Sequence, residues 1–236
     1  MGNMHSDKTI PKNMDNIIVY SHRGNCSIKS DNSLNSFEQC IKENILNIEL
    51  DVQLTLDGKV IVSHDVLKHD TCIYQLNCNS EYSEDQLLLT KVFSTLPKET
   101  NYIIDLKDVR SHSELVSEVL KICAKYNNFN KIIFSSFNEF HLQELVEYEK
   151  IYNIVLNKSY TTCNLDIDYS TNKIERWNLN HILLNINQIS LEMVNKIKEH
   201  SSVKIFVYTC NSNEDYNYSL NIGVDGIISD NPEKFI

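Results

Sequence analysis

Glycine, proline and arginine are scarce in this chain of 236 residues, which contains five glycines and three prolines. This composition excludes a collagenous chain, and hydrophobic residues at 42% exclude a disordered one and provide enough apolar surface for one large core. Because arginine and glycine are rare, each one at a special place is informative. The arginines stand at positions 23, 110 and 176.

Basic residues are also in short supply, because 22 Lys and Arg face 32 Asp and Glu and give a formal net charge of −10. The general field repels phosphate-rich polymers, so no nucleic acid is expected as a partner. The seven cysteines are an odd number without paired CxxC or Cys/His metal spacing, in a chain too long to depend on disulfides. We expect reduced thiols and a cytoplasmic protein.

Long apolar runs are absent too. No stretch approaches the ~20 apolar residues of a membrane span, and the first thirty residues lack the apolar core of a signal peptide. We expect no transmembrane segment and interpret residues 1–15 as a loose polar arm. Its first six residues match the M-G-x-x-x-[ST] pattern, which we interpret as a chance match; weak membrane contact through myristoylation of Gly2 is the alternative.

From residue 16 onward, short β-branched runs alternate with amphipathic helical stretches. Such alternation predicts parallel strands covered by helices, in a closed eight-stranded barrel or an open doubly wound sheet. The predicted strands cover residues 16–21, 47–52, 59–63, 101–106, 131–135, 152–156, 181–185, 203–209 and 226–229. The predicted helices cover residues 33–44, 84–96, 113–126, 138–148, 191–200 and 213–222. Residues 157–180 are predicted as a long polar loop with room for a short helix.

The turn at Asp57-Gly58 decides between the two folds. A connection of two such residues makes a β-hairpin and is too short for a parallel crossover, so strand 59–63 is a return arm and eight barrel strands remain. The sequence predicts an α/β fold, a TIM (β/α)8 barrel with a β-hairpin excursion after strand 2. We expect one domain over residues 16–236, with residues 65–100 as a short insertion over the barrel mouth.

The hairpin also gathers titratable groups. With two residues in the turn, Asp51 faces His64 across the hairpin and Leu54 faces Ile61. Side chains alternate along a strand, so Glu49 shares the face of Asp51. Two carboxylates in a site of low dielectric repel each other unless a proton or a cation intervenes, and a hard divalent cation is the natural partner. The alternative is that lysine or backbone donors satisfy both.

Further polar residues follow other predicted strands at their C-terminal ends, where TIM barrels carry their active sites. Asp105 and Lys107 share a face after residues 101–104, and His22 and Arg23 come directly after the first strand. A lone histidine or arginine in such a place is usually structural. Joint occurrence at three strand ends favours a functional site.

These motifs resemble those of the glycerophosphodiester phosphodiesterase family, in the same order along the chain. They read His22-Arg23-Gly24, Asp31-Asn32-Ser33, Glu49-Leu50-Asp51, Asp57-Gly58, His64-Asp65 and Asp105-Leu106-Lys107. Further elements similar to the family's follow at 135–137, 208–211 and 226–232. The resemblance covers nearly the whole chain after residue 15.

The resemblance implies a TIM barrel that hydrolyses glycerophosphodiesters to glycerol phosphate and an alcohol. One divalent cation, Ca²⁺ or Mg²⁺, would be held by Glu49, Asp51 and Asp105. His22 is then the general base and His64 the general acid, while Arg23 and Lys107 clamp the phosphate. The nucleophile is either water or the 2-hydroxyl of the substrate's glycerol. Supporting roles are implied for Asp31, Asn32 and Tyr208.

Some positions depart from the family pattern. Asp stands in place of Glu at 31 and 105, and Tyr208 replaces a tryptophan. The segment 65–100 is short beside the capping insertions of enzymes selective for small glycerophosphodiesters, so lysophospholipase D-type cleavage of a lysolipid is an alternative. Two further alternatives are a phospholipase C that stops at a cyclic phosphate and a catalytically idle barrel that binds phosphate.

Overall fold

The computed structural model describes residues 17–25, 29–68, 70–78, 86–108, 110, 114–126, 128–162 and 167–236. The expected arm over residues 1–15, with the myristoylation pattern at Gly2, lies outside the described residues. The expected division into this arm and one domain stays a prediction.

Eight parallel strands close into a barrel, which confirms the predicted TIM (β/α)8 fold. Each strand pairs with the next, and β1 pairs with both β11 and β2, so the ring has no open edge. In spatial order the strands are β1 (Ile18–Ser21), β2 (Asn47–Leu54), β6 (Asn101–Leu106), β7 (Ile132–Ser136), β8 (Asn157–Thr162), β9 (His181–Asn185), β10 (Lys204–Tyr208) and β11 (Gly226–Ser229). The short strand β3 (Val60–Val62) pairs antiparallel with β2 outside this ring, as the predicted return arm.

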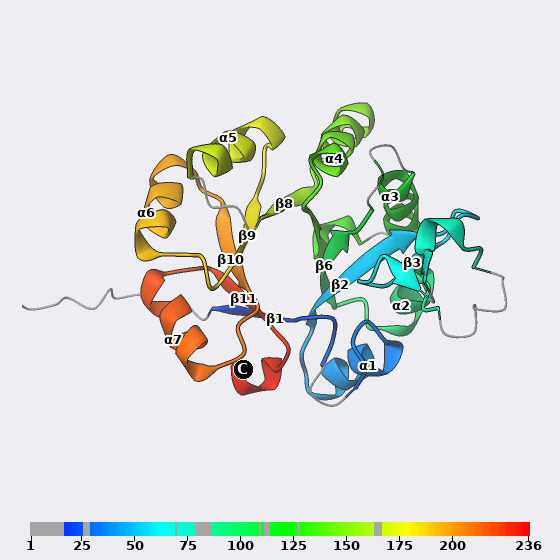
Figure 1. The fold of residues 1–236 in the computed structure, drawn as a ribbon, viewed down its shortest axis with the longest axis horizontal. Coiled ribbons are helices and arrows are strands. Elements are labelled where there is room, and N and C mark those ends of the chain that lie inside the picture. Colours follow the sequence, from blue (N-terminus) through cyan, green and yellow to red (C-terminus); the bar gives the residue numbers. More distant parts are fainter. Residues whose placement is uncertain are drawn as a thin grey trace, which may run out of the picture.

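Helices follow one another around the outside of the strands, as Figure 1 shows. Serine caps fix three of the helix starts, because Ser33, Ser190 and Ser212 each accept a backbone N–H three residues later. The helices are α1 (Leu34–Lys42), α2 (Leu89–Thr95), α3 (Leu115–Tyr126), α4 (Glu139–Tyr152), α5 (Ile167–Trp177), α6 (Leu191–His200) and α7 (Asn213–Ile222). Single turns of 3-10 helix add η1 (Ile73–Gln75), η3 (Phe129–Lys131) and η4 (Pro232–Lys234).

Two apolar clusters hold the layers together. The larger one packs the helices onto the strands and includes Phe37, Leu50, Val92 and Leu142. The smaller one fills the barrel with one side chain from each of six strands: Tyr20, Ile103, Ile133, Leu183, Phe206 and Ile228. This inner layer is the floor beneath the C-terminal strand ends.

The predicted strand at residues 152–156 is wrong. Helix α4 continues to Tyr152 and ends at Asn153, whose φ of 51° is left-handed, and β8 begins only at Asn157. Strand β8 is rich in polar residues that find buried partners. Lys158 is fully buried, and its Nζ lies 2.5 Å from Glu149, while the hydroxyls of Ser135 and Thr161 are hydrogen bonded. Partnered polar groups can occupy a core, so apolar periodicity does not mark this strand.

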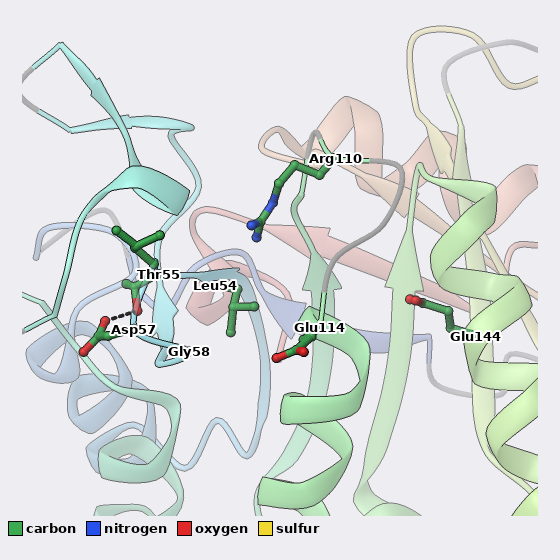
Figure 2. Close-up of a pocket in the computed structure, with 8 residues that line it drawn as sticks. Leu54, Thr55, Asp57, Gly58, Arg110, Glu114 and Glu144 are labelled. Carbon is green, nitrogen blue, oxygen red and sulfur yellow. Dashed lines mark hydrogen bonds between the residues drawn. The ribbon is translucent and has the colours of Figure 1, made fainter.

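The turn between β2 and β3 has three residues, not two. Thr55 N–H donates to the carbonyl of Lys59 at 3.0 Å, and Gly58 takes the left-handed φ of 73° that closes such a loop. The hydroxyl of Thr55 donates to Asp57 at 2.7 Å, the dashed line in Figure 2. The turn lines a cavity of about 670 Å³ together with Arg110, Glu114 and Glu144.

This extra turn residue shifts the register of the hairpin. Val52 pairs with Val62, Gln53 with Ile61 and Leu54 with Val60. The predicted pairings of Asp51 with His64 and of Leu54 with Ile61 are therefore wrong. The N–H of Ser63 donates to the carbonyl of Asp51 at 3.0 Å, so His64 lies one residue beyond the predicted position.

The segment after the hairpin contains β4 (Leu67–Lys68) and β5 (Thr71–Cys72), which pair with each other, then η1 and α2. Helix α2 begins at Leu89, later than predicted, and buries Leu89, Val92 and Phe93 in the main core. This part of residues 65–100 therefore belongs to the helical wall of the barrel. A covering role for the rest stays a prediction.

None of the helices in the described ranges combines the length and the apolar character that a membrane span requires. Five cysteines fall within these ranges and are free thiols: Cys40, Cys72, Cys78, Cys123 and Cys210.

Candidate active site

The candidate site lies directly above the apolar floor of the barrel. Side chains alternate along a strand, so the residue two positions beyond a floor residue points into the same space. All six floor residues are followed in this way by polar ones: Tyr20 by His22, Ile103 by Asp105, Ile133 by Ser135, Leu183 by Asn185, Phe206 by Tyr208, and Ile228 by Asp230. The fold therefore collects these groups at the C-terminal strand ends.

Three carboxylates meet at the centre of this space. Glu49, Asp51 and Asp105 are 5%, 2% and 6% exposed, and one oxygen of each lies within 4.8 Å of the others. Burial and the negative charge of Asp51 raise the pKa of Glu49, and burial also raises the pKa of Asp105 although Lys107 opposes this. Both shifts report the cost of collecting negative charge away from water.

Two cationic side chains offset part of this charge. The Nζ of Lys107 lies 2.7 Å from Asp105 and 3.4 Å from Asp51. The Nε of Arg23 lies 3.1 Å from the other oxygen of Asp51. Burial favours the neutral amine of Lys107, but the charges of Asp105 and Asp51 outweigh it and raise its pKa. Lys107 therefore stays charged.

The donor set fits a hard divalent cation. Oδ1 of Asp105 is buried and has no hydrogen-bond partner among the described residues, although a carboxylate oxygen in such a place needs one. Three carboxylates in reach of one point are the ligands that Ca²⁺ and Mg²⁺ prefer. Within the described ranges, Glu49, Asp51 and Asp105 form the one group of three or more His, Cys, Asp or Glu side chains whose ligand atoms lie close enough together to hold a metal ion.

The loop after β1 supplies backbone support to the carboxylates. Arg23 and Gly24 have left-handed φ angles of 55° and 86°, and this turn lets the N–H of Arg23 donate to Glu49 at 3.0 Å. Glycine is required next to it, because a Cβ at position 24 would lie 2.3 Å from the hydroxyl of Ser36.

Asn32 holds both the side chain and the backbone of Asp51. Its carboxamide donates to Oδ2 of Asp51 at 2.9 Å and accepts the backbone N–H of the same residue at 3.3 Å. The cap of α1 is Ser33, so Asn32 does not serve as the N-cap. Asp31, which is half exposed, lies 3.2 Å from Nη1 of Arg23 and braces its guanidinium.

His22 is held by a carboxylate that the sequence reasoning did not assign to the site. Its Nδ1 lies 2.6 Å from Asp230, whose other oxygen accepts from Asn211 at 2.6 Å. Burial works against protonation, but the bond to Asp230 and the charge of Glu49 outweigh it and raise the pKa of His22. A proton on Nδ1 leaves the Nε2 lone pair available. Asp230 could have been found by applying the strand-end rule to the last strand.

His64 lies near the site despite the shifted register, because it lines a cavity together with Asp31 and Asn32. Its charge, with that of Lys107, opposes the burial that raises the pKa of Asp105. Nδ1 of His64 lies 3.0 Å from the exposed Asp65. His64 lines a cavity of about 290 Å³ and His22 one of about 630 Å³; Asp31 lines both.

Tyr208 is linked to Lys107 of the site through Phe137. Its hydroxyl donates to the carbonyl of Thr162 at 3.3 Å, and its ring lies edge-on to Phe137 with centroids 6.4 Å apart. The ring centroid of Phe137 in turn lies 4.8 Å from the Nζ of Lys107. The structure links Arg23, Asp31, Asn32, Glu49, Asp51, Asp105 and Lys107 by direct contacts or through the shared carboxylate cluster, and it adds Asp230 and Asn211 as partners of His22. The catalytic roles of His22 and His64 and the supporting role of Tyr208 stay predictions.

Comparison with known proteins agrees with this geometry. The model of the glycerophosphoryl diester phosphodiesterase family matches residues 22–234, so the chain belongs to this family. A glycerophosphodiester phosphodiesterase of Caldanaerobacter subterraneus subsp. tengcongensis is 26% identical, over 93% of this chain and 96% of the relative. The enzyme class predicted from the motifs, a phosphodiesterase, is confirmed.

Solved structures show the same fold. The glycerophosphodiester phosphodiesterase of Thermotoga maritima matches with a TM-score of 0.77 at 27% identity, over 93% of this chain and 96% of the other. A phosphodiesterase of Oleispira antarctica, solved in complex with the product sn-glycerol-3-phosphate, matches with a TM-score of 0.81 at 20% identity. That match covers 92% of this chain and 94% of the other.

The bond between His22 and Asp230 predicts how the imidazole titrates. Its raised pKa means that protonated His22 stabilises the folded chain at low pH, and this contribution is lost as the pH rises through the raised pKa. Asp230→Asn removes the carboxylate charge, so the NMR titration midpoint of His22 should move to lower pH. The His200 signal is an internal control, because its ring bonds within α6. An unchanged His22 midpoint in Asp230→Asn would contradict the assignment.

Proposed function

We propose that the protein hydrolyses glycerophosphodiesters to glycerol phosphate and an alcohol, with one divalent cation, Ca²⁺ or Mg²⁺, and two histidines as acid and base. The observation that carries the proposal is the meeting of Glu49, Asp51 and Asp105 at one point. His22 and His64 line two cavities that share Asp31, which contacts Arg23 of the same site. The relatives named as glycerophosphodiester phosphodiesterases support the substrate class.

The charge of the site suits a phosphodiester. Three carboxylates outnumber the cationic Arg23 and Lys107 by one, so a divalent cation leaves this cluster positive and attractive to a phosphodiester anion. A cation held by the carboxylates supplies charge stabilisation for the phosphoryl oxygens as negative charge builds on them. Lys107 and Arg23 are placed beside the same point and bind the phosphate oxygens.

The two histidines serve opposite ends of the reaction. In-line displacement at phosphorus has the attacking and leaving oxygens on opposite sides of the phosphoryl group. His22, with its proton held on Nδ1 by Asp230, accepts a proton at Nε2 from the attacking hydroxyl, either of water or of the glycerol. His64, in the other cavity, donates a proton to the leaving alcohol oxygen.

Apolar residues beside the site support lysophospholipids as a second substrate class. Phe137 is 44% exposed and contacts Lys107, and Leu67, at 55% exposed, lines the cavity of His64. Both could cover part of an acyl chain. Small glycerophosphodiesters remain the first choice, because polar groups form most of both cavities.

The function is tested by turnover of glycerophosphocholine, glycerophosphoinositol and lysophosphatidylcholine, each with and without chelator. We expect hydrolysis that stops on chelation and returns with Ca²⁺ or Mg²⁺, because the carboxylates otherwise leave the site negative. Full turnover by demonstrably metal-free protein would contradict the role of the cation. A persistent cyclic phosphate would indicate a phospholipase C, and no turnover at all would indicate an idle barrel.

The histidine roles predict separate defects. His22→Ala and His64→Ala should each lower kcat by about 10²–10⁴-fold, the usual contribution of acid and base catalysis, while the fold is retained. The exposed His200 provides the matched control, and His200→Ala should leave kcat unchanged. Near-normal turnover by either active-site variant would show that the histidine replaced in it has a structural role and is not the acid or base.

A further inference from the structure

We propose that Gln53 is the positioning residue for His64, acting through the backbone that carries it. The proposal rests on the proposed function, in which His64 is the acid for the leaving alcohol. Gln53 lies on the inward face of β2, two residues beyond Asp51 and four beyond Glu49. It is only 5% exposed, so its carboxamide needs partners within the protein.

These partners are three consecutive carbonyl groups. Nε2 of Gln53 donates to the carbonyl oxygens of Ser63 at 3.1 Å, His64 at 3.2 Å and Asp65 at 2.6 Å. For one amide to reach all three, the chain must curl around it. The side chain of Gln53 thus sets the curvature of the loop on which the imidazole stands.

Few other hydrogen bonds of the described residues hold this loop: the hydroxyl of Ser63 donates to the carbonyl of Asp65 at 3.3 Å within it, and the N–H of Ile73 donates to the carbonyl of Val66 at 3.0 Å beyond it. Strand β3 ends at Val62, and the bond from Ser63 N–H to Asp51 is the last one that the hairpin ladder provides. The contact of His64 with Asp65 lies within the loop, and the Asp65 side chain is 85% exposed. The direction of the imidazole relative to the carboxylates therefore depends on Gln53.

The consequence is confined to one half of the reaction. As the bond from phosphorus to the leaving oxygen breaks, its electron pair stays on that oxygen, which takes the proton of the His64 imidazolium and leaves neutral imidazole. A leaving group such as 4-nitrophenolate is stable as an anion and needs no such proton. A misplaced His64 therefore impairs release of an aliphatic alcohol and spares release of 4-nitrophenolate.

The test compares Gln53→Met, which keeps length but removes the donor, with the same substitution at Gln143 on helix α4, whose amide donates to Glu147 at 2.6 Å. For glycerophosphocholine, Gln53→Met should lower kcat by up to about 10²-fold with little change in KM, the scale expected when a catalytic group is misplaced. Gln53→Glu should lose more, because a carboxylate repels the three carbonyls. Glycerol 4-nitrophenyl phosphate should be cleaved at nearly the normal rate, and Gln143→Met should keep kcat on both substrates.

Coupling with His64 gives the sharper criterion. Gln53→Met combined with His64→Ala should be no slower than His64→Ala alone, because both changes remove the same proton donor. Equal losses of Gln53→Met on both substrates, or losses that multiply in the double variant, would overturn the proposal.

An NMR measurement separates this proposal from the proposed function. The side-chain ¹⁵N signals of His64 should shift in Gln53→Met and stay in place in Gln143→Met, and this readout needs no turnover. If the wild-type chain cleaves neither substrate, the proposed function fails while the NMR comparison still decides whether Gln53 positions His64. Unshifted signals in Gln53→Met would refute the proposal.

Discussion

Three buried carboxylates at one point are the constraint on which this structure depends. Taking an ionised group out of water costs several kcal/mol, and Glu49, Asp51 and Asp105 share one small volume. The protein meets this cost with Lys107, Arg23 and directed hydrogen bonds, and it still leaves Oδ1 of Asp105 without a partner among the described residues. Such an arrangement is unfavourable as a stabilising core and suited to holding a cation.

The barrel explains how so much charge can be concentrated. Its apolar floor supports the side chains above it, and the strands deliver carboxylates from β2 and β6 in neighbouring positions. Around them, each reactive group has its own support: Asn32 for Asp51, Asp230 for His22 and Gln53 for the loop of His64. These supports come from different segments, so the site is organised by tertiary packing and not by a single motif.

Sequence patterns predict the parts of this structure that rest on local order. Alternation indicated parallel strands covered by helices, the hairpin turn at Asp57-Gly58 left eight strands for a barrel, and strand-end positions indicated Glu49, Asp51 and Asp105. Strand β8 was not predicted, because its polar residues are buried with partners such as Glu149 and apolar periodicity does not reveal such partners. The hairpin register was predicted wrongly, because the hydrogen bonds of Thr55 select a three-residue turn in place of the two-residue turn. Asp230 lies within the sequence element 226–232 that resembles the family's. Its contact with His22 joins opposite ends of the described chain, so local sequence patterns do not predict it.

The most direct test is a calorimetric titration of Ca²⁺ or Mg²⁺ into metal-free protein, in two buffers that differ in ionisation enthalpy. The account predicts one ion per chain and a release of protons on binding. The protons leave because burial raises the pKa of Glu49 and Asp105, whereas the ion binds their ionised forms. Asp51→Asn should weaken binding strongly. Absence of binding, or binding without proton release, would contradict the assignment of these carboxylates as a cation site.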